Sequence, residues 1–137
     1  MPHIHKSKLS LRISGDSLVP SDVSAMLGAT PSFCHAKGEE VRSKTTGSLR
    51  IARSGMWRLS VDEQSPESLE KQLQELFANM TDDLSVWENI EKQYSADLFV
   101  GLFMLETNEG LTISSETLKM ISDRHLEIGF DIYAPDC

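Results

Sequence analysis

Polar and apolar residues alternate near both ends of the chain. Leu9, Leu11 and Ile13 occupy every second position, which is the spacing of a strand with one buried face. Residues 126–132 alternate in the same way, with apolar residues at the even positions. Between these segments, residues 98–105 form an apolar run. A strand that is apolar on both faces is expected in the middle of a sheet.

Four other segments carry apolar residues at helical spacing. The first begins at Pro20, which suits a first helical turn, and is expected to end at Gly28. The second is predicted to open at Ser65-Pro66-Glu67 and to continue to residue 80. The third covers residues 83–94, and the fourth follows a capping serine at Ser114.

The region between residues 29 and 61 is harder to assign. Residues 29–47 contain several Pro and Gly breakers and are predicted to be a loop. Residues 49–61 form either one long strand or a hairpin that turns near residues 53–55. A weak repeat of strand, helix and strand occurs over residues 9–61 and again over residues 98–132. The chain could therefore consist of two β-α-β halves.

Together these elements predict a single α+β domain over residues 1–137. Its sheet is expected to be antiparallel or mixed, with four to five strands and with the helices packed mainly on one face. The expected core contains the apolar residues that share the inward face of each element: Leu9, Leu11, Ile13, Val23, Leu27, Trp57, Leu59, Leu73, Phe77, Val100, Leu102, Leu118, Ile128 and Ile132.

The composition and the motifs of the chain argue against several classes of protein. The first 15 residues have no apolar run after their basic residues, and no stretch is long enough to cross a bilayer. We therefore expect a soluble, cytoplasmic protein. The two cysteines and four histidines are scattered, apart from the pair Cys34-His35, so neither a disulfide framework nor a metal site is predicted. Phosphate-loop, dinucleotide and nucleophile-elbow motifs are absent from the sequence, and no cofactor is expected.

Charge is distributed unevenly along the chain. Nine of the 13 basic residues but only four of the 21 acidic residues precede residue 59. The first 58 residues therefore carry +5 and the rest −13, which gives the net charge of −8. Such an acidic chain suits a basic protein partner or a second copy of itself better than a nucleic acid. The predicted contact surface is the acidic side of the middle helices, with Glu70, Glu75 and Glu88 as the test positions.

One segment, residues 30–39, gathers side chains that could form a small-molecule site. It contains a histidine, a thiol, a cation and a carboxylate near a flexible glycine. A nucleophile–base pair would require Cys34 and His35 to meet in space. No third group that could orient His35 is evident, so no catalytic residue is assigned. The candidate ligand-binding residues are Phe33, Cys34, His35, Lys37 and Glu39.

Short motifs spread over most of the chain carry a family resemblance. They are mainly structural residues: Leu11, Ile13 and Gly15; Pro20 with Leu27-Gly28; Pro31 with Lys37-Gly38-Glu39; Trp57-Arg58-Leu59-Ser60; and Phe130-Asp131-Ile132-Tyr133. In these motifs the chain resembles the bacterial family called domain of unknown function 4279. The resemblance implies a small bacterial domain with no established reaction, and an immunity-like role against toxins is an associated expectation. We therefore predict a non-catalytic protein-binding module, either immunity-like or self-associating. The alternative is a small-ligand-binding domain or a minor enzyme that uses residues 30–39.

Overall fold

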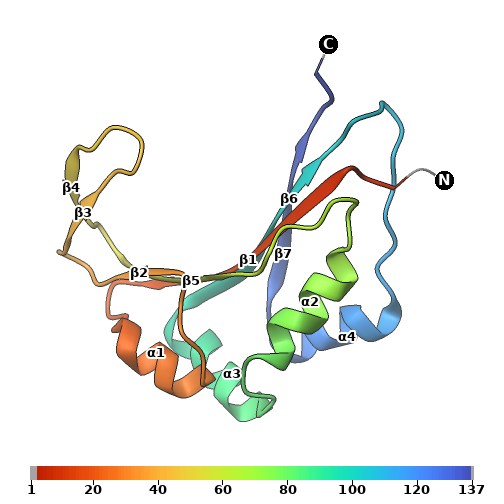
Figure 1. Ribbon diagram of the computed structural model, residues 1–137. Coiled ribbons are helices and arrows are strands. Elements are labelled where there is room, and N and C mark those ends of the chain that lie inside the picture. Colours follow the sequence, from red (N-terminus) through yellow and green to blue (C-terminus); the bar gives the residue numbers. More distant parts are fainter. Residues whose placement is uncertain (1–2, 137) are drawn as a thin grey trace.

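The computed structural model describes residues 3–136, in which four helices lie against one face of a five-stranded mixed sheet (Figure 1). A separate two-stranded hairpin, β3–β4, stands off one end of the sheet. The α+β class and the placement of the helices are therefore confirmed. The elements, in chain order, are β1 (Lys6–Gly15), α1 (Pro20–Leu27), β2 (Phe33–His35), β3 (Glu40–Arg42), β4 (Leu49–Ile51), β5 (Gly55–Ser60), α2 (Leu69–Ala78), α3 (Leu84–Gln93), β6 (Ser95–Phe103), α4 (Ser115–Asp123) and β7 (Glu127–Tyr133).

The strand order is β2-β5-β1-β6-β7, with β1 at the centre and β7 at one edge. Neighbouring strands are antiparallel except β6 and β7, which are parallel and are joined through α4. The two expected β-α-β halves are not confirmed. In the first half β1 and β5 are antiparallel neighbours, whereas in the second half β6 and β7 are parallel, so the two halves use different pairings.

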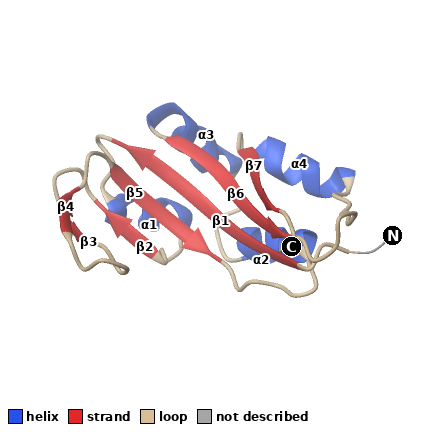
Figure 2. Ribbon diagram, turned by 90° about the horizontal axis from the view of Figure 1, so that it is seen from above, coloured by secondary structure: helices blue, strands red, loops and turns tan. Residues whose placement is uncertain are grey.

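The apolar core lies between the sheet and the helices, while the opposite face of the sheet is uncovered (Figure 2). Most of the predicted core residues are buried there, including all three from β1 and the indole of Trp57. Leu59 and Ile128 are only half-buried. The prediction was wrong for Leu118 and Ile132, whose side chains are 49% and 59% exposed. Both belong to the α4–β7 end of the fold, where the edge strand has no neighbour on its outer side.

The segment from residue 29 to residue 61 differs most from the prediction. It contains three short strands, β2, β3 and β4, before β5. Neither one long strand nor a hairpin at residues 53–55 is present, because β4 pairs with β3 while β5 pairs with β1 and β2. Three-residue strands are too short to show a clear alternation of polar and apolar residues.

Side-chain caps mark the starts of two of the four helices in residues 3–136. Asp83 accepts a hydrogen bond from the Ser85 amide at the start of α3, and Ser114 accepts one from the Thr117 amide at the start of α4. Helix α2 begins at Leu69, later than the predicted start at Ser65. Among the described residues, no helix has the length and apolar character needed to cross a membrane.

Candidate functional site

The uncovered face of the sheet changes charge from one side to the other. Arg58 on β5 and Lys8 on β1 point to this face, whereas Glu127 and Asp131 line it on β7. Between them, Arg12 on β1 forms two hydrogen bonds with Asp97 on β6, of 2.8 and 2.7 Å. The order of strands therefore converts the uneven charge along the chain into a gradient across the open face.

Aromatic rings hold several of these cations close to the sheet. The Arg12 guanidinium lies 4.6 Å from the centre of the Phe99 ring, and the ammonium group of Lys6 lies 4.5 Å from that of Phe103. The Phe103 ring in turn stacks on Tyr133, with the ring centres 4.6 Å apart. Cation–π contacts of this kind attract the charged groups to the ring faces and so hold them near the sheet. The open face therefore carries charged groups that are held beside aromatic rings.

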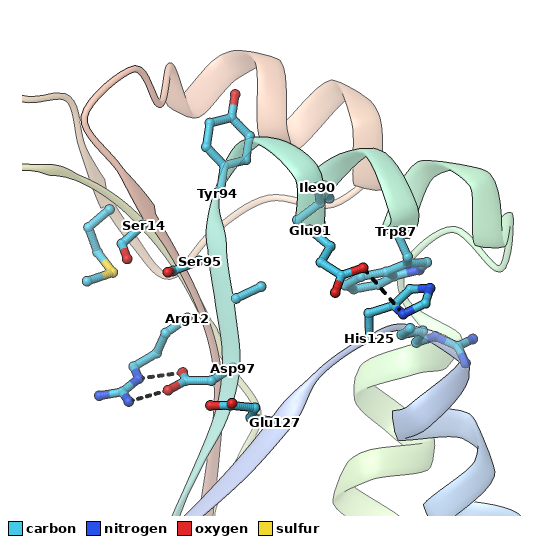
Figure 3. A pocket seen from close by; sticks show the side chains of 13 residues that line it. Arg12, Ser14, Trp87, Ile90, Glu91, Tyr94, Ser95, Asp97, His125 and Glu127 are labelled. Carbon is cyan, nitrogen blue, oxygen red and sulfur yellow. Dashed lines mark hydrogen bonds and ion pairs between the residues drawn. The ribbon is translucent and has the colours of Figure 1, made fainter.

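One end of this face leads into a pocket of about 530 Å³ between β6, α3 and the start of β7 (Figure 3). Arg12 and Asp97 lie on one wall, and their hydrogen bonds raise the pKa of Arg12 above its ordinary value. On the other wall, Nδ1 of His125 lies 3.3 Å from a carboxylate oxygen of Glu91. The pocket thus contains the Arg12–Asp97 ion pair and a separate contact between His125 and Glu91.

A buried arginine lies behind the His125 wall. The guanidinium of Arg124 packs 4.5 Å from the centre of the Phe77 ring, and its Nη1 donates to the carbonyl of Met120. Burial lowers the pKa of Arg124, and its Nε has no hydrogen-bond partner among residues 3–136. This packing against aromatic rings fixes the turn between α4 and β7, so Arg124 acts as a structural residue of the pocket wall.

The sequence model of one protein family, described as domain of unknown function (DUF4279), matches residues 5–135. The chain belongs to the DUF4279 family. This confirms the resemblance carried by the sequence motifs, and it covers nearly all of the chain. No curated protein and no solved structure matches it. Membership in the DUF4279 family therefore establishes what the chain is related to and leaves its activity to be inferred from the site.

Within this DUF4279 domain, the candidate ligand-binding residues do not converge on one point. Phe33 and His35 share a face of β2, with their rings in edge-to-face contact and their centres 5.4 Å apart. Cys34 points to the opposite face, because successive strand residues alternate. Lys37 pairs with Asp16 at 3.4 Å, and the side chain of Glu39 is exposed. A Cys34–His35 nucleophile pair has no geometric support. No cluster of three metal-ligating side chains occurs in the described part of the chain.

The predicted partner-binding glutamates occupy different environments. Glu70 on α2 accepts a hydrogen bond from the Ser114 amide, which lowers the pKa of its carboxyl and ties α2 to the start of α4. Glu88 on α3 pairs with Lys92 one turn later, at 3.4 Å. Glu75 is exposed at the rim of a small hollow near β5. Of these three residues, Glu75 alone has no hydrogen bond or ion pair among the described residues.

Two features of the DUF4279 fold were missed from the sequence. The first is the outer edge of β7, where Ile132, which was assigned to the core, is exposed together with Phe130. The second is a cavity beside the β3–β4 hairpin, lined in part by Arg50 and Arg53. The alternation in residues 126–132 identified the strand but could not show that it lies at an edge. One strand of the hairpin, β3, lies in the segment that was predicted to be a loop, and the other, β4, lies in the segment that was predicted to be one long strand or a hairpin near residues 53–55.

Proposed function

We propose that this domain is a protein-binding module that self-associates through the edge of β7. The observation that carries the proposal is the exposure of large apolar side chains on this strand. Phe130 and Ile132 are 43% and 59% exposed, although their neighbours on β6, Val100 and Leu102, are buried. Exposed apolar residues along an unpaired edge strand are typical of a surface that another strand covers.

The backbone of β7 is arranged to accept such a strand. The carbonyl of Tyr133 accepts a hydrogen bond from the Met104 amide at 3.0 Å, so the backbone groups of Tyr133 face inward. Because the backbone groups of successive strand residues point to opposite sides, those of Ile128, Phe130 and Ile132 face the outer edge. The residues with outward-facing backbone groups are therefore the same residues that expose apolar side chains.

The sequence of β7 is self-complementary when two copies pair antiparallel about Phe130. In this register Ile128 lies opposite Ile132 of the second copy, and the two Phe130 residues lie opposite each other. Gly129 lies opposite Asp131, so the Asp131 carboxylate faces a residue without a side chain, and Glu127 lies opposite Tyr133. Paired apolar side chains across strands stabilise a sheet, while like charges placed directly opposite each other destabilise it. This match favours a second copy of the chain over an unrelated partner.

The alternative of a basic protein partner on the acidic helices has weaker support. Glu70 and Glu88 already interact with Ser114 and Lys92, so binding there would have to replace existing contacts. The proposed strand pairing requires no such exchange. Pairing of two seven-residue strands buries a small area, and interfaces below about 1,200 Å² belong to weak, reversible complexes. We therefore expect a dimer whose population depends on protein concentration.

Sedimentation velocity of the full chain from about 5 to about 500 µM tests this proposal, because mass action populates a weak dimer at the upper end. We expect the wild type to shift from monomer to dimer. Phe130→Lys should remain monomeric, since a lysine on an edge strand opposes pairing. Leu49→Lys is the matched control, because Leu49 is 55% exposed on β4, and it should dimerise like the wild type.

Amide hydrogen exchange tests the register. At high concentration the amides of Ile128, Phe130 and Ile132 should be protected in the wild type and not in Phe130→Lys. A wild type that stays monomeric at the highest concentration contradicts the proposal. So does a dimer that Phe130→Lys leaves unchanged.

A further inference from the structure

A second cavity, of about 940 Å³, lies at the end of the sheet away from β7. Its walls come from the ends of β1 and β5, from β2, and from β4 with the segment that follows it. The hairpin that forms the outer wall is braced at its base, where Gly38 donates to the carbonyl of Ala52 and Ala52 donates to the carbonyl of Glu39. The cavity is therefore a feature of the folded framework.

The lining of this cavity is cationic. Arg50, Arg53 and His35 are among the residues that line it. No aspartate or glutamate is among the residues that form the walls. This is unusual in a chain with a net charge of −8, because acidic residues outnumber basic ones overall. An electropositive hollow in an acidic protein favours an anionic ligand.

The arginines of this cavity lack partners within the described residues. His35 lies deeper in the wall: it is more than nine-tenths buried, and its Nδ1 has neither a hydrogen-bond partner nor contact with solvent. Neither Arg50 nor Arg53 forms an ion pair or a side-chain hydrogen bond within residues 3–136. By contrast, Arg12 is bonded to Asp97 and Arg42 to the carbonyl of Gly47. Two cations without partners on the wall of one cavity leave their N–H donors available to an anionic ligand.

We propose that the cavity between the β3–β4 hairpin and the end of the sheet binds a phosphate monoester that carries an apolar substituent. A phosphate group offers more acceptor oxygens than a carboxylate and matches the fork of a guanidinium. Arg50 and Arg53 supply its donors, and Ser14 and Ser54 line the same cavity.

The rest of the lining accounts for the apolar substituent. Ile51, Ala52 and Met56 form the hydrocarbon part of the wall, and the side chain of Ile51 is 59% exposed. Covering that side chain with a ligand would remove apolar surface from water. A ligand with a charged head and an apolar body therefore matches both parts of the cavity. This inference is independent of the proposed dimer.

Phenyl phosphate is the probe for this site, because it combines a phosphate monoester with an apolar ring. In a titration followed by two-dimensional NMR, we expect saturable shifts at the amides of His35 and residues 50–56. Inorganic phosphate, which lacks the ring, should bind more weakly, and benzoate, which lacks the phosphate, should bind more weakly still.

Paired variants separate site binding from general charge effects. Arg50→Gln/Arg53→Gln should weaken binding at least about tenfold, since each guanidinium–phosphate contact is a charge-assisted hydrogen bond. The control Lys44→Gln/Lys71→Gln removes the same charge from exposed residues outside the cavity, and should stay within about twofold of the wild type. Shifts that fall elsewhere, an absence of saturable shifts, or equal losses in both double variants would overturn the proposal.

Discussion

The buried side chain of Gln72 provides the sharpest test of how the helices are fixed to the sheet. Its Oε1 accepts a hydrogen bond from the Ser7 hydroxyl at 2.6 Å. Its Nε2 donates to the carbonyls of Ser7 and Asp62, at 3.1 and 3.0 Å. Gln72 and Ser7 are fully buried, so α2 is joined to β1 through polar contacts inside an otherwise apolar layer.

Replacing Gln72 with methionine keeps the size of the side chain and removes all three hydrogen bonds. Each neutral hydrogen bond contributes about 1 kcal/mol net, and a buried hydroxyl that loses its acceptor adds a desolvation cost. The greater apolar character of methionine offsets part of this loss. We expect Gln72→Met to reduce the free energy of unfolding by about 2–3 kcal/mol, with an unchanged dependence on denaturant concentration.

The double variant Ser7→Ala/Gln72→Met supplies the decisive comparison. Ser7→Ala removes the same hydrogen bond between the Ser7 hydroxyl and Gln72 Oε1, and it leaves Gln72 Oε1 without that donor. The loss of this bond therefore contributes to the destabilisation in both single variants. The double variant should therefore be more stable than additivity predicts, by about 1 kcal/mol. Urea unfolding of the four proteins at low concentration measures this coupling. Strict additivity, or a Gln72→Met variant within about 0.5 kcal/mol of the wild type, would refute the reasoning.

Two further predictions concern backbone packing and pH. A Cβ atom added at Gly55 would lie 2.8 Å from the carbonyl oxygen of Gly15, so Gly55→Ala should destabilise the fold by about 1–3 kcal/mol. A Cβ atom added at Gly129 has no atom within 4 Å, so Gly129→Ala should leave the stability nearly unchanged. Thermal melts of the two variants measure the difference. Glu70→Gln tests the carboxyl whose pKa the Ser114 amide lowers. A carboxyl whose pKa is lower in the folded state than in the unfolded state stabilises the fold at pH values above its unfolded-state pKa. This stabilisation is lost as the pH falls through the folded-state pKa. The variant should therefore be less stable than wild type at neutral pH and converge with it below about pH 4. A difference that persists at lower pH would contradict this assignment.

The sequence was sufficient for elements whose residues repeat over several positions. The alternation from Leu9 to Ile13 predicted β1, and the apolar run from residue 98 predicted β6 in the interior of the sheet. Both predictions are confirmed, since these strands are adjacent and buried. The predicted cap at Ser114 is also present, because capping is a local hydrogen bond that depends on neighbouring residues only.

Features that depend on distant parts of the chain could not be predicted in this way. The alternation at Ile128 and Ile132 matches that of a core strand, but exposure depends on whether a further strand lies beyond β7. Likewise, residues 49–61 were predicted to form a strand or a hairpin, while the place of Arg50 in a cavity depends on the β3–β4 pairing. The site prediction near His35 identified one residue of this cavity without the arginines that complete it.

The positions of the two proposed sites make a last prediction possible. The β7 edge and the cavity lie at opposite ends of the strand order β2-β5-β1-β6-β7. Adjacent strands are about 4.8 Å apart, so the two edge strands are separated by roughly 19 Å of hydrogen-bonded sheet. Coupling between sites must be reciprocal and requires two arrangements of the element that joins them. A continuous ladder through β1 offers no evident second arrangement.

We therefore expect the two sites to act independently. Phe130→Lys should bind phenyl phosphate within about twofold of the wild-type affinity, and saturating phenyl phosphate should leave the dimerisation constant unchanged to the same extent. Sedimentation velocity with and without the probe measures the second quantity. A larger change that appears equally in both measurements would show that the sheet transmits a conformational change, and that the cavity and the β7 edge form one regulated system.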